Sequence, residues 1–276
     1  MVKSTSAWGA HYGGNVPAEV LIVVPTLGSR LDFLDQTLTS IRDQSVTSDV
    51  IVVTPHQRSE ARELAERHGA RVLDDPGSLP SAINLGVGAA DSTHQFVNWI
   101  GDDDLLAPGS LDVTVAALHA DPHAVVAYGS CAYIDDEGRA LWTSSAGRWA
   151  TRILSWGPDL IPQPGMLMRR QAWVNVGGVD ESLRFAFDLD LLLKLRREGS
   201  FVDVGRVVSS FRWHPDSLTV SDRTASLDES ELVKRRYLSR VGRSMSWTWE
   251  RPVRLATRMA AREVTRRALK ARQLAT

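Results

Sequence analysis

The chain contains very little cysteine and no long apolar segment. Its 276 residues include one cysteine, Cys131, which excludes a disulfide within the chain and a metal cluster built on cysteine thiolates. Such sparing use of cysteine is typical of a reducing compartment. No apolar run approaches the roughly 18–20 residues that span a bilayer, and residues 1–15 lack the apolar core of a signal peptide. These absences predict a cytoplasmic protein.

Charge is distributed unevenly along the chain. The composition, 43% hydrophobic and 24% charged, is that of an ordinary globular protein, and the formal net charge is −1. Residues 234–276, however, carry 13 Lys or Arg and only 2 Asp or Glu, so the rest of the chain is acidic. A basic end of this kind indicates an anionic partner, which could be a membrane surface, a nucleic acid or an acidic patch on another copy of the chain.

Apolar runs and helical periodicities alternate in the first part of the chain. The runs predict buried strands at 20–25, 50–53, 71–73 and 96–100, and the periodicities predict helices at 31–41, 59–68 and 80–90. This alternation is typical of a parallel sheet with helices on both faces, in which ligands bind at the carboxyl ends of the strands.

The second part of the chain reads as a less regular continuation of the same sheet. It predicts helices at 110–120, 148–156, 169–176 and 188–198, strands at 124–133, 166–168 and 201–211, and a hairpin strand at 140–143. Three prolines within 158–164 exclude regular structure there. We expect a polar lead-in (1–18), one α/β domain (19–220) with its halves at 19–120 and 121–220, and a basic helical extension (221–276).

Three consecutive carboxylates, Asp102, Asp103 and Asp104, follow the predicted strand at 96–100. Neighbouring carboxylates disfavour each other's ionisation, and a divalent cation such as Mg²⁺ or Mn²⁺ relieves that repulsion. Their position at a strand end favours a metal site. The alternative is a solvated acidic turn that only stabilises the N-terminus of the following helix through its dipole.

A series of short motifs occurs in a fixed order along residues 18–219. The motifs are Pro25-Thr26, Ala82-Ile83-Asn84-Leu85-Gly86, Trp99-Ile100-Gly101-Asp102-Asp103-Asp104 with Pro108, Gly177-Gly178-Val179-Asp180-Glu181, Phe187-Asp188-Leu189-Asp190-Leu191, and Arg212-Trp213-His214 with Ser217. They resemble those of family 2 glycosyltransferases, which implies the GT-A fold, with a Rossmann-like, mostly parallel sheet flanked by helices. The resemblance also implies an inverting transferase that uses a nucleotide-diphosphate sugar with Mn²⁺ or Mg²⁺.

The resemblance also implies roles for individual residues. Asp103 is expected to bind the metal, with Asp104 and His214 as further ligands, although a lone histidine in a loop is more often structural. Asp188 is expected to act as the general base that deprotonates the acceptor, and the alternative is that it only caps its helix. Further contacts with the substrate are expected from Pro25, Thr26, Asn84, Asp102, Asp104, Gln163, Asp190 and Arg212, of which Arg212 could equally pair with a surface carboxylate.

The surroundings of Asp188 carry one more expectation. Phe185 and Phe187 flank this carboxylate, and aromatic rings that dehydrate a carboxylate raise its pKa. Because they lie two residues apart on a helix, Asp188 and Asp190 cannot both face one site.

The chain departs from the family pattern in two places. Family members commonly carry an Asp pair after the second strand, where one Asp holds the nucleotide base, but here Thr54 follows Val53. Thr54 could form one hydrogen bond with a pyrimidine edge, which favours UDP or dTDP over GDP. The metal motif begins with Gly101 where many relatives have an Asp.

The absence of the base-binding Asp after the second strand makes an inactive nucleotide-sugar-binding protein one alternative. A sugar nucleotidyltransferase is another, disfavoured because the loop at 26–30 has one glycine and no lysine.

The partners follow from the same reasoning. A glycosyltransferase of this kind modifies a hydroxyl in a glycan, a glycolipid or a cell-surface polysaccharide, and the acceptor could be lipid-linked. The basic helix predicted at 251–274 could be a solvated helix or could bind an anionic membrane, which would place the protein at the inner membrane face. No nucleic acid is expected, because no reader motif accompanies the charge.

Overall fold

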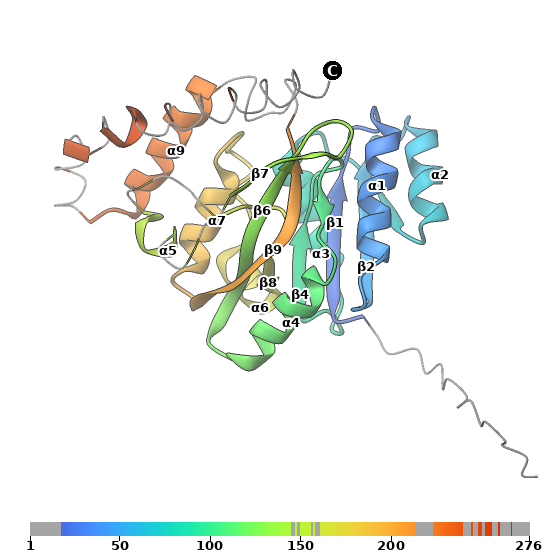
Figure 1. Cartoon of the computed structure of the whole chain (residues 1–276), viewed down its shortest axis with the longest axis horizontal. Helices are drawn as coiled ribbons and strands as arrows, with labels where there is room; N and C mark the ends of the chain where they lie inside the picture. Colours follow the sequence, from blue (N-terminus) through green and yellow to red (C-terminus); the bar gives the residue numbers. More distant parts are fainter. Residues whose placement is uncertain are drawn as a thin grey trace, which may run out of the picture.

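The structure, a computed structural model, describes residues 18–144, 147, 150–155, 157, 161–213, 223–239, 244, 248–249, 252–255, 259 and 266. Within these residues a nine-stranded sheet lies between two layers of helices (Figure 1). The strand order is β3-β2-β1-β4-β8-β6-β9-β5, with β7 beside β6. The predicted α/β fold with its largely parallel sheet is confirmed.

The first four strands are parallel and match the predicted apolar runs. They are β1 (Val20–Pro25), β2 (Ser48–Thr54), β3 (Arg71–Asp74) and β4 (Phe96–Trp99). Every residue of β1 is buried, because alternate side chains enter the cores on the two faces of the sheet. A continuous apolar run is what a strand covered on both faces requires.

The second half of the chain extends the same sheet. Strand β8 (Leu167–Arg169) is antiparallel to both β4 and β6 (Ala124–Ile134), so β6 runs in the same direction as β1 and β4. Strand β9 (Ser200–Arg212) is parallel to β6. The carboxyl ends of β1, β2, β4, β6 and β9 therefore lie at one edge of the sheet, which we call the carboxyl edge.

Two short strands complete the sheet. The hairpin strand β7 (Ala140–Ser144) pairs with β6 as predicted. Strand β5 (Leu105–Leu106) was not predicted, and it pairs with β9 through Leu105 and Ser210. A strand of two residues is too short to leave a period-two pattern in the sequence.

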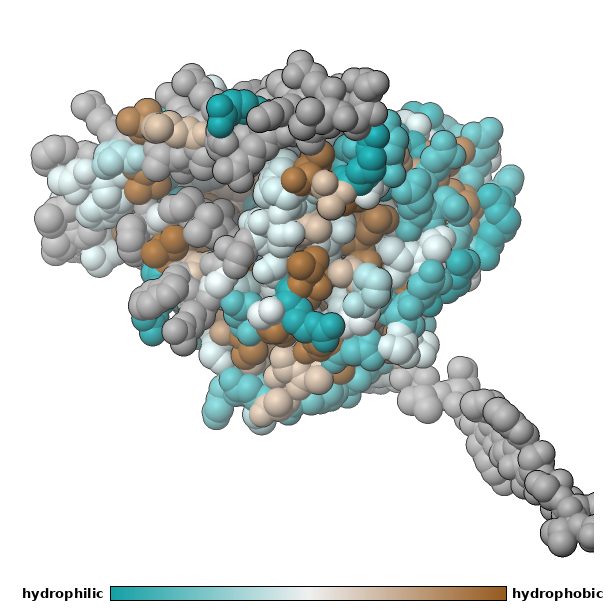
Figure 2. Space-filling model, viewed as in Figure 1, coloured by the Kyte–Doolittle hydropathy of each residue, from teal (hydrophilic) through white to brown (hydrophobic). Residues whose placement is uncertain are grey.

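Helices cover both faces. On one face lie α1 (Leu31–Arg42), α2 (Ser59–Arg67) and α4 (Ser110–Ala120). The outer surface of α1 and α2 is strongly hydrophilic (right side of Figure 2). The opposite face carries α3 (Leu79–Gly88), α5 (Ala150–Ile153), α6 (Arg170–Val176) and α7 (Phe187–Leu195).

The C-terminal extension begins with a helix that belongs to the core. Helix α9 (Arg223–Tyr237) packs against α7, and its Val233 is fully buried in the core cluster on that face. Arg254 pairs with Asp228 at 2.5 Å and Glu231 at 3.3 Å, both on α9. Most of the helix predicted at 251–274 lies outside the described residues. No helix in the described part of the chain is long and apolar enough to cross a bilayer.

The loop before β8 is pinned to β9 by a close backbone approach. Gly165 has a φ of 78°, and a Cβ there would lie 2.8 Å from the carbonyl oxygen of Val208 and 2.9 Å from the Cβ of Ser209. The hydroxyl of Ser209 donates a hydrogen bond of 2.6 Å to the carbonyl of Pro164. This contact fixes the position of Gln163 at the carboxyl edge.

We predict that Gly165→Ala destabilises the protein more than Gly69→Ala. Both glycines have a left-handed φ, but a Cβ at Gly69 meets nothing within 4 Å. Gly69→Ala should therefore lower the free energy of unfolding only by the backbone term of about 1–2 kcal/mol. At Gly165 the steric overlap should add about 1–3 kcal/mol. Urea unfolding of the two variants measures the difference, and equal losses would contradict the close approach.

Candidate active site

The three aspartates form a tight turn directly after β4. The amide of Ile100 donates to the carbonyl of Val23, and the amide of Asp104 donates to the carbonyl of Gly101 at 3.3 Å. Asp102 and Asp104 are buried, whereas the side chain of Asp103 is 16% exposed. Burial, together with the charge of Asp103, raises the pKa of Asp104 well above its usual value and raises the pKa of Asp102. This acidic turn (residues 101–104) carries charge that the surrounding residues must compensate.

Arg30, just before α1, provides part of that compensation. Its guanidinium lies 3.1 Å from Asp102 Oδ1 and 3.0 Å from Asp103 Oδ2. The hydroxyl of Thr26 donates a hydrogen bond of 2.5 Å to Asp102 Oδ2 and accepts one from the amide of Gly28. Sequence reasoning assigned no role to Arg30. A positively charged residue in the loop after the first strand could have indicated that Arg30 contacts the acidic turn.

Two residues predicted to contact the substrate, Thr26 and Pro25, are buried at the end of β1. The hydroxyl of Thr26 is engaged with Asp102, so the structure gives it a structural role in holding the acidic turn. Asp102, also expected to contact the substrate, is held in turn by Thr26 and Arg30.

The structure corrects the role predicted for Arg212. It was expected to bind phosphate or to pair with a surface carboxylate, but its side chain is buried and only 1% of the residue is exposed. The guanidinium lies 4.2 Å from the centre of the Phe33 ring and donates only to atoms of the protein. Its acceptors are the carbonyls of Asp103, Asp135 and Asp136 and the side chain of Gln36, at 2.8–3.1 Å. The backbone amide of Arg212 also donates to Asp104 Oδ1 at 3.0 Å. Arg212 therefore fixes the acidic turn from the end of β9.

Helix α1 holds the residues after the turn. Thr37 donates from its hydroxyl to the carbonyl of Asp104 at 2.8 Å, and Ser40 accepts from the amide of Leu106. Gln44 donates to the carbonyl of Ala107. Thr37 and Ser40 belong to α1 and Gln44 follows two residues after its end, so this helix and the residues just after it fix the segment after β4.

Asp188 lies at the start of α7. The N-cap residue of this helix is Ala186, so Asp188 is not the N-cap but the second residue of the helix. Asp188 Oδ1 accepts from the amide of Leu189 at 2.7 Å. Burial raises the pKa of Asp188 to about 6, and the negative charge of Glu229 contributes to the increase. The predicted direction of the pKa shift is confirmed.

A contact between two aromatic rings joins the start of α7 to the end of β4. The ring of Trp99, the last residue of β4, lies 6.5 Å from that of Phe187, the residue before Asp188. Gln163 joins them from a third segment, because its amide donates to the carbonyl of Trp99 at 2.6 Å. The end of β4, the start of α7 and the loop before β8 therefore meet at the carboxyl edge. This cluster of segments is the candidate active site.

The structure also corrects the role predicted for Asp190. This expected substrate contact is 1% exposed, and its carboxylate pairs with Lys194 at 2.8 Å and accepts from the hydroxyl of Tyr237 at 2.7 Å. Asp190 is therefore a buried structural carboxylate. The expectation that Asp188 and Asp190 do not share a site agrees with this arrangement.

Two further residues have a different role from the one expected. The amide group of Asn84 donates to the carbonyl of Val179 and to Glu181, and its oxygen accepts from the amide of Val179. Asn84 therefore ties α3 to the loop after α6. Thr54, expected to reach the nucleotide base, is fully buried, and its hydroxyl has no hydrogen-bond partner in the described part of the chain. His214 lies outside the described residues.

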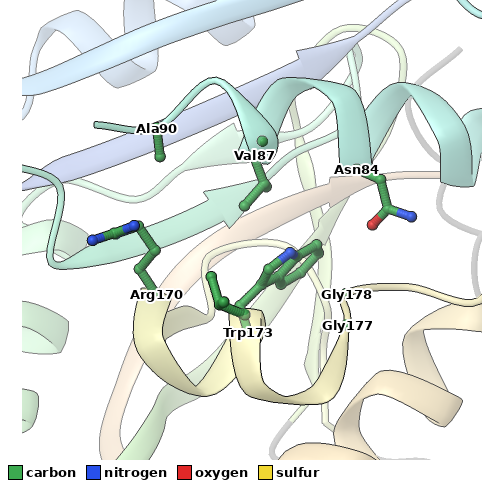
Figure 3. A pocket seen from close by; sticks show the side chains of 9 residues that line it. Asn84, Val87, Ala90, Arg170, Trp173, Gly177 and Gly178 are labelled. Carbon is green, nitrogen blue, oxygen red and sulfur yellow. The ribbon is translucent and has the colours of Figure 1, made fainter. Parts of the chain in front are cut away.

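A groove of about 340 Å³ lies away from this edge, between α3 and α6 (Figure 3). Asn84, Val87 and Ala90 line one side, and Trp173 and Arg170 line the other. Arg170 donates to the carbonyl of His94, just before β4 begins, so the groove extends toward the amino ends of the strands. It is therefore not part of the candidate active site.

Residues 21–175 match the sequence model described as Glycosyl transferase family 2. The chain belongs to this family. It is 26% identical over 260 residues to the O-antigen biosynthesis protein RfbC of Myxococcus xanthus, a match that covers 88% of the chain and 20% of that protein. An uncharacterized glycosyltransferase of Rickettsia typhi is 23% identical, with 80% of this chain and 72% of that protein covered. The chondroitin synthase of Escherichia coli is 23% identical, with 59% and 24% covered. The chain thus spans about a fifth of the Myxococcus protein.

Solved structures support the GT-A fold of this glycosyltransferase. S. aureus TarS, residues 1–349, superposes with a TM-score of 0.59 at 16% identity, over 83% of this chain and 69% of that one. The same TarS fragment in complex with UDP gives 0.55 at 17% identity, over 81% and 72%. The family assignment favours a glycosyltransferase over the sugar nucleotidyltransferase that the sequence left as an alternative.

The family also implies a divalent cation, and two carboxylates of the acidic turn are oxygen ligands of the kind that such a cation needs. Among the described residues, no group of three His, Cys, Asp or Glu side chains forms a metal cluster. Two carboxylates do converge over Gly101, where a Cβ would lie 3.0 Å from Asp103 Oδ1 and 3.2 Å from Asp104 Oδ2. The missing side chain at Gly101 leaves the space that these oxygens occupy. Hard carboxylate oxygens at one point fit Mg²⁺ or Mn²⁺.

We predict that the two arginines at the acidic turn differ in their contribution to stability. Arg212→Ala should lower the free energy of unfolding by about 3–5 kcal/mol, because it leaves buried acceptors and the charge of Asp104 uncompensated. Arg30→Ala should lower it by about 1 kcal/mol at most, since the side chain of Arg30 is 37% exposed. Urea unfolding at neutral pH measures both. A larger loss for Arg30→Ala would overturn the structural role given to Arg212.

Proposed function

We propose that this family 2 glycosyltransferase moves a sugar from a nucleoside-diphosphate donor to an acceptor hydroxyl, with inversion at the anomeric carbon and with Mn²⁺ or Mg²⁺. The observation that carries the proposal is that the segments bearing two kinds of carboxylate meet at the carboxyl edge. The acidic turn follows β4, and Asp188 stands at the start of α7, joined to β4 through the contact between Trp99 and Phe187.

The acidic turn is suited to the diphosphate. Asp103, the most exposed of its three carboxylates, would hold the cation together with Asp104. When bound, the cation neutralises charge on the leaving diphosphate as a Lewis acid. Arg30 adds a positive charge to the same place, because its guanidinium already spans Asp102 and Asp103.

Asp188 is suited to accept the proton of the acceptor hydroxyl. With a pKa of about 6 it is ionised at neutral pH and still has a useful affinity for a proton. As the proton moves to Asp188, the acceptor oxygen forms its bond to the anomeric carbon and the bond to the diphosphate breaks on the opposite side. Attack from the opposite side inverts the configuration of that carbon.

The relatives support a choice of donor and acceptor. TarS has been crystallised with UDP, which supports a uridine nucleotide as the donor here. The names of the Myxococcus and Escherichia relatives, O-antigen biosynthesis protein and chondroitin synthase, support a growing polysaccharide as the acceptor. Because Thr54 is fully buried, we no longer propose it as the residue that reads the base.

We predict that UDP binds more tightly with Mn²⁺ than without it, and more tightly than GDP. Asp103→Asn should abolish the gain from Mn²⁺, because it removes a charged oxygen ligand, and should leave the fold intact. Asp43→Asn, an exposed aspartate at the end of α1, is the matched control. Isothermal titration calorimetry measures the affinities. A gain from Mn²⁺ that survives Asp103→Asn would disprove the metal assignment.

We predict that sugar transfer decreases as the pH falls through about 6, since protonated Asp188 cannot accept a proton. Asp188→Asn should lower kcat by about 10²–10⁴-fold, the usual contribution of a general base, with the affinity for UDP unchanged. It should not lower the melting temperature at pH 8, because it removes a charge that burial disfavours. Release of UDP from a UDP-sugar, with and without acceptor, measures kcat. Full activity of Asp188→Asn would show that the base lies elsewhere.

A further inference from the structure

Helix α9 places a carboxylate against the segment that leads into α7. Glu229 accepts hydrogen bonds from three consecutive backbone amides. The amide of Arg184 lies 3.0 and 3.2 Å from its two oxygens, that of Phe185 lies 2.5 Å from Oε2, and that of Ala186 lies 2.7 Å from Oε2. Asp188 follows two residues after the last of these amides.

The amides that Glu229 binds precede the first turn of α7, where backbone N–H groups have no partner inside the helix. The N-cap residue Ala186 offers no side-chain acceptor, and Glu229 binds the amide of this residue and those of the two residues before it, so the carboxylate fixes the chain that enters the helix. A negative charge at this end also interacts favourably with the helix dipole, and hydrogen bonds to an ionised acceptor are the stronger kind. Glu229 therefore fixes the backbone from which Asp188 projects.

The rest of α9 is aligned on α7 in the same way. Glu229, Val233 and Tyr237 are spaced four residues apart, so they lie on one face of the helix. Val233 is fully buried, and the hydroxyl of Tyr237 donates to Asp190 at 2.7 Å. Arg236 adds an ion pair of 2.9 Å with Asp180. One face of α9 thus holds α7 at its start and one turn further along.

We propose that Glu229 is a positioning residue for the general base, through which α9 becomes part of the catalytic machinery. The proposal rests on the function proposed above for Asp188. Residues 223–237 lie beyond the segment that the family model matches, residues 21–175. The basic C-terminal extension therefore begins with a segment that serves the reaction.

The charge of Glu229 gives the proposal a measurable consequence. Among the described residues, Glu229 from α9 is the charged group that acts on the carboxyl of Asp188 from another element, and the nearest charged residues along its own segment are Arg184 and Asp190. The guanidinium of Arg184 lies over the ring of Phe185, and Asp190 is paired with Lys194. Glu229 is therefore the like charge that Asp188 faces from another element, and it adds to the effect of burial on the pKa of Asp188.

The experiment compares Glu229→Gln, Glu229→Ala and Glu229→Asp with a control on the same helix, Glu231→Gln, which faces Arg254. Two quantities are measured in the full-length chain. The first is the pKa of the Asp188 carboxyl from a ¹³C NMR titration, assigned by comparison with Asp188→Asn. The second is kcat, KM for a UDP-sugar and the pH profile of transfer.

Glu229→Gln should lower the pKa of Asp188, because a like charge is removed, and should move the acidic limb of the pH profile to lower pH. Glu229→Ala should lower kcat by up to about 10²-fold, the effect of a displacement near 1 Å, without a change in KM for the donor. Glu229→Asp keeps the charge but shortens the reach. It should preserve the pKa and lose turnover, and it replaces the alanine variant if that one fails to fold. Glu231→Gln should change neither quantity.

The proposal is overturned if Asp188 titrates alike in the wild type and Glu229→Gln while kcat matches that of Glu231→Gln. It is also overturned if the loss in kcat is matched by weaker donor binding, since Glu229 would then act on the donor site. The titration does not depend on transfer. A wild type that transfers no sugar, but whose Asp188 responds to Glu229→Gln, would reject the proposed function and retain the coupling between Glu229 and Asp188.

Discussion

The burial of the acidic turn is the constraint on which the rest of the site depends. Three adjacent carboxylates, two of them buried, repel one another at a strand end where water cannot screen them well. The fold compensates with groups from distant parts of the chain. Arg30 pairs with the exposed side of the turn, and Arg212 fixes its buried side through the carbonyl of Asp103. The end of β9 is thereby locked to the end of β4, although more than 100 residues separate them in the sequence.

The two arginines have different roles because Arg212 is buried and Arg30 is partly exposed. The guanidinium of Arg212 is surrounded by carbonyls and the ring of Phe33, so it has no freedom to meet a ligand. Arg30 is more than a third exposed and contacts the two carboxylates that lie nearest to solvent. A residue of this second kind can exchange one anionic partner for another at little cost. The fixed arginine therefore belongs to the fold, and the exposed one is the arginine to which the proposed function gives a contact with the diphosphate.

Much of the fold could be predicted from the sequence, because local patterns specify it. Strand β1 is a continuous apolar run since both its faces are covered, and α4 was predicted with its observed bounds, Ser110–Ala120. The position of the acidic turn and the raised pKa of Asp188 followed from adjacent residues. The roles of Arg212, Asp190 and Glu229 did not, because each has a partner that lies more than 40 residues away. The periodicity of a sequence does not indicate which distant group a buried charge contacts. An arginine or aspartate that binds a ligand therefore cannot be told from one that stabilises the fold.

At the start of α7, the repulsion between two carboxylates lowers stability, while the hydrogen bonds of one of them hold the backbone in place. The half-buried carboxylate of Asp188 is disfavoured by dehydration, and Glu229 adds a like charge close to it. An uncharged acceptor in place of Glu229 would lessen that repulsion, but it would hold the three amides of 184–186 less strongly. The carboxylate has two effects at once, because it anchors the backbone through its oxygens and raises the proton affinity of the neighbouring Asp188. If Asp188 is the base that we propose, the catalytic domain includes α9.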